Sequence, residues 1–212
     1  SDATGVNANT LLTRVVVTLT NAGTINYATT YQGASGSQAR CATTINNTDF
    51  FIADQGGQFT NNATSASPTG NFRGIRAFGG VVYLGSQSPT AGTNEVRVAT
   101  ALTGGEVQAL PGIGNNNTFQ DFFFISSGSN GATFDVLYIL RSTSATAGTI
   151  EKFSLVSGTW TSNGTYTTDF GGFSLAAEQH NSGARLYVTS GTGATTANRV
   201  IRLTDAAGFN TS

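Results

Sequence analysis

The stretch Val15–Gly23 reads VVVTLTNAG, and three later stretches repeat its form. The later copies are VRVATALTG at Val96–Gly104, IEKFSLVSG at Ile150–Gly158 and VIRLTDAAG at Val200–Gly208. In each copy a strand-like run ends on glycine, which is typical of a β-strand entering a turn. A second phrase, an apolar–aromatic strand core, occurs at Phe50–Ile52, Val82–Leu84, Leu137–Ile139 and Leu186–Val188. Two recurring strand types predict repeated antiparallel units that bury their faces against one another.

The spacing of these phrases indicates the size of the unit. The glycine-ended phrase starts at positions 15, 96, 150 and 200, so its gaps are 81, 54 and 50. The aromatic core, counted at Phe51, Tyr83, Tyr138 and Tyr187, has gaps of 32, 55 and 49. The last two gaps agree, and a repeat of about 50 residues is the length of a kelch-type propeller blade. We therefore expect an all-β chain, a β-propeller of about four to five four-stranded blades.

Turn residues divide the chain into candidate blades of one propeller domain, residues 1–212. We expect a half-blade at 11–32 and a blade at 38–70 whose outer hairpin, 58–71, is shortened. Further blades are expected at 71–112 and 118–168, followed by a partial blade at 171–212. Because a closed propeller needs about 4–8 blades, the chain is expected to be an incomplete or internal portion of a larger one. Its open strand edges should then pair with missing blades or with other copies of the chain.

Composition narrows the class of protein. Charged residues make up only 10% of the chain, and ten basic residues nearly balance eleven acidic ones. No basic stripe suits nucleic acid, and no apolar run reaches the ~18 residues that span a bilayer. The chain has no methionine, so we expect that a targeting segment has been removed or that the record begins inside a longer polypeptide.

Five Asn-x-Thr/Ser triplets point to a secreted chain. The candidate glycosylation sites are Asn46, Asn62, Asn116, Asn163 and Asn210, all in predicted turns or loops. A chain rich in Asn, Thr and Ser also forms such triplets by chance. Cys41 is the lone cysteine, so it is either a small buried strand residue or a partner for an intermolecular disulfide.

Candidate chemistry is sparse. Glu178 and His180 could contribute metal ligands or a base, but a metal site needs three or four ligands, so a solvated turn histidine is favoured. Carboxylates recur near strand ends at Asp49, Asp54, Asp121, Asp135 and Asp169. They could ring a propeller channel as a calcium site or glycosidase pair, but turn capping is the simpler use.

The aromatic residues also have two interpretations each. Phe122, Phe123 and Phe124 suit a strand buried on both faces, with a sugar-stacking platform as the alternative. Trp160 and Tyr166 are the candidate ligand-binding residues, although packing against a neighbouring blade is favoured for Trp160. We predict no catalytic residue, no metal site and no cofactor.

Several segments resemble one family. The stretches TIEKFSLVSGTWTSNGTYT (149–167) and SGARLYVTSGTGATTANRVIRLTDAAGFNTS (182–212) are similar to blades of large, secreted, uncharacterised microbial β-propeller repeat proteins. The resemblance continues through TRVVVTLTNAGTINYATTY (13–31) and ARCATTINNTDFFIADQGG (39–57), and so covers most of residues 13–212. It implies a propeller fold and blades beyond both ends, and it carries over no catalytic residue.

Three functions follow as alternatives. The first is a non-enzymatic extracellular structural or adhesive glycoprotein, a propeller building block of a cell-surface matrix, sheath or filament. The second is a carbohydrate-binding propeller, and the third is a propeller glycoside hydrolase or lyase. The third requires at least two of Asp121, Asp169, Glu178 and His180 to converge.

Overall fold

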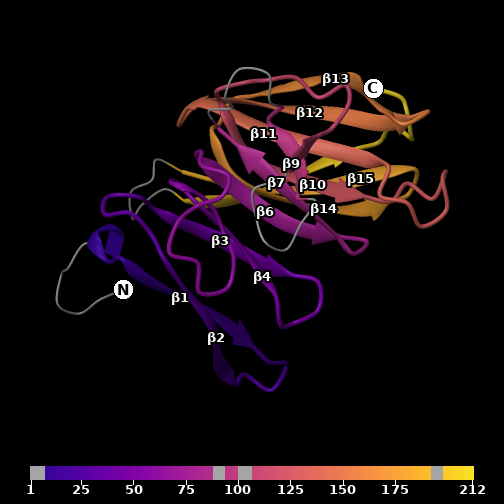
Figure 1. Cartoon of the computed structure of the whole chain (residues 1–212). Coiled ribbons are helices and arrows are strands. Elements are labelled where there is room, and N and C mark those ends of the chain that lie inside the picture. The colour runs from indigo at the N-terminus through magenta and orange to yellow at the C-terminus, as the bar shows by residue number, and fades with distance from the viewer. Residues whose placement is uncertain (1–7, 88–93, 100–106, 192–197) are drawn as a thin grey trace. The chain divides into compact units, whose positions relative to one another are not determined.

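The chain folds into short antiparallel β-strands (Figure 1). The computed structural model describes residues 8–87, 94–99, 107–191 and 198–212. The strands are β1 (Thr13–Leu19), β2 (Ile25–Gln32), β3 (Ala39–Thr44), β4 (Phe50–Asp54), β5 (Gly57–Phe59), β6 (Phe72–Phe78), β7 (Val81–Ser86), β8 (Val96–Ala99), β9 (Val107–Ala109), β10 (Phe119–Ile125), β11 (Val136–Ser144), β12 (Ala147–Val156), β13 (Thr159–Thr168), β14 (Gly172–His180), β15 (Gly183–Ser190) and β16 (Arg199–Asp205). The helical content of these residues is one 3-10 turn, Ala8–Thr10. The prediction of an all-β chain is confirmed.

The strands form five small sheets, each a meander of consecutive strands. Their orders are β1-β2, β3-β4-β5, β6-β7-β8-β9, β10-β11-β12-β13 and β14-β15-β16. Consecutive pairing by short turns follows from the glycine-ended strands, because tight turns place neighbouring strands side by side. Two of the described sheets have four strands, whereas the β3–β5 and β14–β16 sheets have three and the β1–β2 sheet has two.

The chain divides into two compact units, which are described separately. Unit 1 comprises Ser1–Leu84 and Arg97–Gln108, and unit 2 comprises Gly85–Val96 and Ala109–Ser212. The assignment of 1–212 to one propeller domain, and its division into blades, stays a prediction. None of the helical segments in the described ranges has the length and apolarity needed to cross a bilayer.

Each unit has its own apolar core. In unit 1, Phe51, Ala53, Phe72, Ile75, Val82 and Leu84 form one buried cluster, and Val16, Tyr31, Phe50, Ile52 and Phe59 form another. In unit 2 the buried cluster is Ile125, Val136, Tyr138, Leu140, Ile150, Phe170, Leu175, Ala184, Leu186 and Val188. The aromatic strand cores seen in the sequence therefore supply much of the interior.

Residues 58–71 return antiparallel to the short strand β5: Gly57 bridges Thr69, and Gln58 exchanges backbone hydrogen bonds with Ser67 and Pro68. Two local predictions differ from the structure. Strand β14 continues to His180, so Glu178 and His180 lie in a strand and not in a turn. Asn163 lies within β13, whereas a loop was predicted. In the copy at Val96–Gly104, residues 100–104 lie outside the described residues.

Candidate functional site

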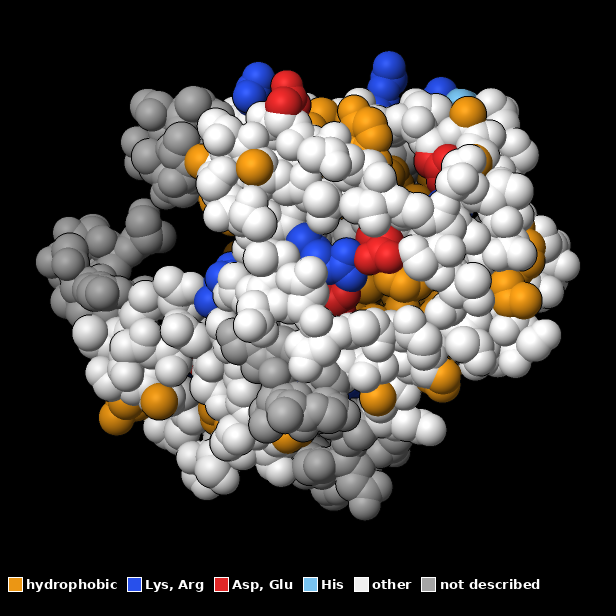
Figure 2. All heavy atoms as spheres, turned by 90° about the horizontal axis from the view of Figure 1, so that it is seen from above, with side chains coloured by type: hydrophobic (Ala, Val, Ile, Leu, Met, Phe, Trp, Pro, Cys, Tyr) orange, Lys and Arg blue, Asp and Glu red, His pale blue; other side chains and the backbone are white. Residues whose placement is uncertain are grey.

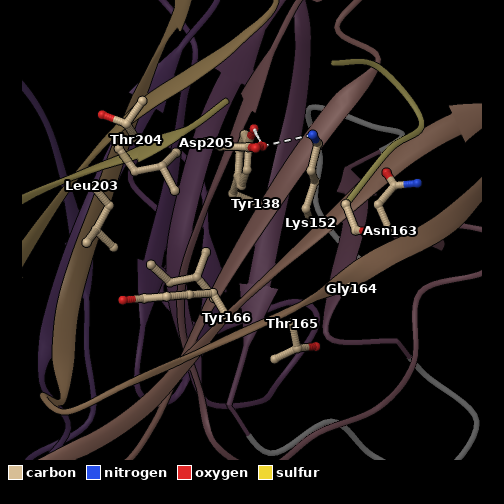
Figure 3. A pocket seen from close by; sticks show the side chains of 12 residues that line it. Tyr138, Lys152, Asn163, Gly164, Thr165, Tyr166, Leu203, Thr204 and Asp205 are labelled. Atoms are coloured by element: carbon tan, nitrogen blue, oxygen red, sulfur yellow. Dashed lines mark hydrogen bonds and ion pairs between the residues drawn. The ribbon is translucent and has the colours of Figure 1, made fainter. Parts of the chain in front are cut away.

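The candidate site is a groove in unit 2 between the β10–β13 and β14–β16 sheets (Figure 3). Its volume is about 450 Å³. The lining residues are Tyr138, Ile150, Lys152, Asn163, Gly164, Thr165, Tyr166, Leu186, Leu203, Thr204, Asp205 and Ser212. They come mainly from β11, β12, β13, β15 and β16, so facing strands of two neighbouring sheets form its walls.

The strands at the mouth of the groove are the outermost strands of their sheets. In the described part of the chain β13 pairs only with β12, and β16 pairs only with β15. The sheet that contains β13 has a fourth strand, but the facing sheet stops at its third strand, β16. Among the described strands, β16 therefore has one unpaired edge, and its residues Leu203, Thr204 and Asp205 line the groove.

The floor of the groove holds a satisfied charge cluster. The Lys152 ammonium lies 2.8 Å from Asp205 Oδ2, and the Tyr138 hydroxyl donates to the same oxygen at 2.7 Å. Lys152 also donates to the carbonyl oxygens of Ala207 at 3.1 Å and Gly208 at 2.9 Å. Because an ammonium group has three donors, Lys152 has none left for a ligand.

The protonation of Tyr138 suits this structural role. Burial, reinforced by the hydrogen bond to Asp205 and its negative charge, raises the pKa of Tyr138 above its usual range. The phenol therefore stays neutral and acts as a donor near neutral pH. Figure 3 shows Tyr138, Lys152 and Asp205 close together, with a dashed line between Lys152 and Asp205.

A second set of polar contacts holds the segment that follows β16. The Ser154 hydroxyl donates to Asn163 Oδ1 at 2.7 Å, and the Asn163 amide donates to Asn210 Oδ1 at 3.1 Å. The Asn210 backbone N–H in turn donates to Ser154 Oγ at 3.0 Å. Together with Lys152, these bonds tie residues 207–210 to β12 and β13.

Of the two predicted ligand-binding residues, the structure places only Tyr166 at the groove. Its side chain is 60% exposed. Trp160 is 5% exposed, and its ring lies edge-on to Phe124 with centroids 5.2 Å apart. Its backbone N–H donates to the Pro111 carbonyl oxygen. Trp160 thus has a packing environment and offers no ring face to a ligand.

Three of the predicted carboxylates make hydrogen bonds inside the fold. Asp135 accepts from the Ser127 backbone and hydroxyl, and Asp54 accepts from the Gly56 backbone N–H at 2.8 Å, which agrees with turn capping. Asp54 also pairs with Arg14. Asp121 accepts from Ser174 Oγ and the Leu175 N–H, both at 2.8 Å, and so connects β10 to β14.

The residues considered for catalysis make their described contacts elsewhere. Glu178 accepts from the Tyr187 hydroxyl at 2.8 Å, and the His180 ring lies 3.3 Å from the Asn181 amide. Within the described ranges, no group of three or more His, Cys, Asp or Glu side chains could hold a metal ion. These contacts give the hydrolase alternative no support.

The remaining candidates have mixed environments. Asn46, Asn62, Asn116 and Asn210 are exposed, whereas Asn163 is partly buried and bonded at both ends of its amide. Cys41 is a partly buried cysteine in β3, and its sulfur accepts from the Ile75 N–H at 3.2 Å. The triplet Phe122–Phe124 packs inward, with Phe122 and Phe124 fully buried.

No known protein family and no curated protein matches the chain. A solved structure does: a protein from Bacteroides fragilis NCTC 9343, named provisionally as a 6-phosphogluconolactonase, with a TM-score of 0.50 and 14% sequence identity. The match covers 89% of this chain and 64% of that protein, so this chain spans less than two thirds of its length. At this identity the likeness shows the fold alone. It supports an all-β, propeller-like arrangement, and it does not show a closed ring.

Proposed function

We propose that this chain is a non-enzymatic structural or adhesive protein of the extracellular space, built of β-propeller blades that join other polypeptides by strand pairing. The observation that carries the proposal is the edge of β16 that no other described strand pairs with, in a strand that lines the groove. A strand edge presents unpaired N–H and C=O groups, which form a ready template for another strand. The partly buried Leu203 lines the groove and offers apolar contact to such a strand.

The charged side chains support a structural role over a catalytic one. Lys152 and Asp205 neutralise each other, and buried Arg141 contacts Glu95 and Glu151. Catalytic acids and bases need accessible groups whose pKa values suit the reaction. The charges described here instead satisfy one another inside the fold.

The extracellular setting and the propeller assignment rest on other observations. The resemblance to secreted propeller repeat proteins and the exposed Asn-x-Thr/Ser triplets favour secretion. Meandering sheets of up to four strands, together with the propeller-like fold of the Bacteroides fragilis protein, favour blades.

Association in solution tests the proposal. We expect the wild-type chain to form larger species as its concentration rises in sedimentation velocity experiments. Thr204 is exposed at the groove, so Thr204→Lys should weaken association by placing a charge where the new strand would pack. Ser129→Lys adds the same charge in an exposed loop and should leave association unchanged. A wild-type chain that remains a monomer at every concentration contradicts the proposal.

A second candidate function is saccharide binding, favoured by the exposed Tyr166 ring at the groove. Aromatic rings stack on sugar faces, and the hydroxyls of Thr165 and Thr204 line the same groove. A glycan array should then give signals that Tyr166→Ala removes. Tyr27→Ala, which changes an exposed tyrosine of unit 1, should leave those signals intact. An array without signals above background removes this candidate.

A further inference from the structure

Unit 2 contains a second cavity, which is lined by the beginnings of the neighbouring strands β10 and β14 (Figure 1). Its volume is about 300 Å³, at the lower end of the range for small-molecule sites. The turn between β11 and β12 forms another part of its wall, together with Gln87 and Gly191. The described lining residues all belong to unit 2, and none of them lines the groove that contains Tyr166.

Two β-bulges supply side chains to this cavity. The pairing of β10 with β11 shifts its register at Gln120, and the pairing of β14 with β15 shifts its register at Phe173. Both residues line the cavity. A bulge redirects a side chain out of the regular ladder, and bulges are frequent beside functional sites. The two strands therefore each direct one extra residue to the same place.

Gln120 is a buried amide with an unused acceptor. The residue is 9% exposed, and its Oε1 has no hydrogen-bond partner in the described part of the chain. A buried polar atom normally has a partner, because the hydrogen bonds to water that it loses on burial are costly. The backbone beside it is fixed, since the Asp121 carboxylate accepts from Ser174 Oγ and the Leu175 N–H of β14. The acceptor is thus held in position at the cavity, where a donor on a ligand would satisfy it.

Close packing of glycines fixes another wall of the cavity. The Gly171 N–H donates to the Ala145 carbonyl oxygen at 2.8 Å, and a Cβ at Gly171 would collide with the Ser144 carbonyl oxygen. The Ser142 hydroxyl donates to the Gly172 carbonyl oxygen at 2.9 Å and accepts from the Gly172 N–H at 2.7 Å. The turn between β11 and β12 is therefore fastened to the start of β14, so the cavity is formed before a ligand arrives.

The lining of the cavity suits a neutral ligand that has hydroxyl groups and one apolar face. The described lining residues carry no charged side chain. Gln120 has an amide with both donors and an acceptor, and the exposed residues Thr143 and Ser144 add hydroxyl groups. Phe173 is 50% exposed, so part of its ring is available for contact. An amide can bond two adjacent sugar hydroxyls while an aromatic ring packs on the C–H face of the sugar.

We propose that this cavity binds a neutral saccharide unit, with Gln120 hydrogen-bonded to its hydroxyls and Phe173 packed against its C–H face. The site does not depend on strand pairing at β16, and it is separate from the groove that Tyr166 lines. Its small volume fits a single sugar ring.

Binding of simple sugars to the full chain tests the proposal. The probes are the methyl glycosides of glucose, galactose and mannose, together with N-acetylglucosamine, and saturation-transfer difference NMR detects their binding. At least one probe should bind the wild-type chain, and Gln120→Met and Phe173→Ala should each weaken that binding at least about tenfold. Gln179→Met, in an exposed residue of β14, and Tyr166→Ala, in the other groove, should bind as wild type.

Protein stability separates a binding role for Gln120 from a structural one. Because its Oε1 has no partner among the described residues, Gln120→Met should keep or raise the free energy of unfolding while binding is lost. A destabilised Gln120→Met would show that the amide holds the fold together, and it would overturn the assignment. Sedimentation velocity of this variant should match that of wild type, so failure of this site and failure of strand pairing give different results.

Three binding results would also overturn the assignment. The first is that no probe binds the wild-type chain, and the second is that binding persists in both Gln120→Met and Phe173→Ala. The third is that Tyr166→Ala alone abolishes binding, which would place the saccharide in the groove.

Discussion

Each unit contains a buried ion pair in which one aspartate oxygen contacts both a basic side chain and a tyrosine hydroxyl. In unit 2, Lys152 and the Tyr138 hydroxyl contact Asp205 Oδ2, and in unit 1, Arg14 and the Tyr31 hydroxyl contact Asp54 Oδ2. A buried carboxylate is costly unless it is paired and hydrogen-bonded, and the tyrosine supplies the additional donor. These clusters connect strands that are distant in the sequence, so their role is to fix strand positions.

Removing the Tyr138 hydroxyl should destabilise the protein. Hydrogen bonds to charged groups contribute about 1.5–3 kcal/mol, and Tyr138 is almost fully buried, so Tyr138→Phe should lose a free energy of unfolding in that range. Tyr187→Phe is the matched control, because that hydroxyl bonds Glu178 at the surface. Urea unfolding followed by circular dichroism measures both variants. Equal stability of the two variants would show that the Asp205 cluster contributes little.

The raised pKa of Tyr31 predicts how the stability of the protein changes at alkaline pH. Burial raises the pKa of Tyr31 to about 12 from the ordinary 10.0, and the Asp54 charge also raises it while Arg14 opposes the shift. The folded state therefore binds more protons than the unfolded state between these values, and its stability falls as pH rises from about 10 toward 12. Tyr31→Phe should flatten that fall in urea titrations at a series of alkaline pH values. An unchanged slope would contradict the expected shift.

The sequence suggests some of these residues and misses others. Tyr166 could be proposed because an aromatic in a polar, turn-rich stretch suits an exposed position. The Lys152–Asp205 pair could not, because neither residue carries a motif and their strands, β12 and β16, belong to different sheets. The burial of Trp160 also depends on a distant segment, the loop that contains Pro111 and Gly112.

At the scale of elements, the hairpins are predictable because their signal is local. The turn at 20–24 joins β1 to β2, and Gly23 has the positive φ of 81° that the glycine-ended phrase predicts. The segment 58–71 is less predictable, because its only strand, β5, has three residues and the rest follows side-chain packing. Local alternation therefore identifies strands well and identifies the edge strands of short sheets poorly.

The loop before β10 offers a test of close packing between elements. Gly112 has a φ of 88°, and a Cβ there would lie 2.1 Å from the Trp160 carbonyl oxygen. Gly112→Ala combines backbone strain with overpacking, so we expect a loss of at least about 1–3 kcal/mol. Gly114 has open space at its Cβ position, and Gly114→Ala should be neutral or stabilise by about 0.4–1 kcal/mol. Thermal unfolding of the two variants should therefore shift in different directions, and a tolerated Gly112→Ala would contradict the close packing.

At the scale of the whole molecule, the low charge determines how association should respond to salt. Charged residues make up 10% of the chain and the net charge is −1. On the face shown in Figure 2, most side chains and exposed backbone are neither charged nor apolar. Thr, Ser, Asn and Gly therefore form much of the surface that would surround a strand-paired contact.

Although β16 carries the exposed Arg199 and Arg202, association driven by backbone pairing and apolar burial should depend little on ionic strength. Raising salt from about 0.1 M to about 1 M shortens the Debye length from roughly 10 Å to 3 Å and weakens exposed charge pairs. Backbone pairing and apolar burial lack that sensitivity. Sedimentation velocity at the two salt concentrations should give the same distribution of species, and dissociation at high salt would indicate a contact between charges instead.

The environment of Lys152 has a practical consequence for labelling. It is the only lysine of the chain, and its ammonium is bonded to Asp205 and two carbonyl oxygens. An acylating reagent can modify this side chain only when those bonds open and a proton leaves. The rate at which Lys152 becomes acylated therefore measures local opening of the C-terminal segment at this one site, without an introduced probe.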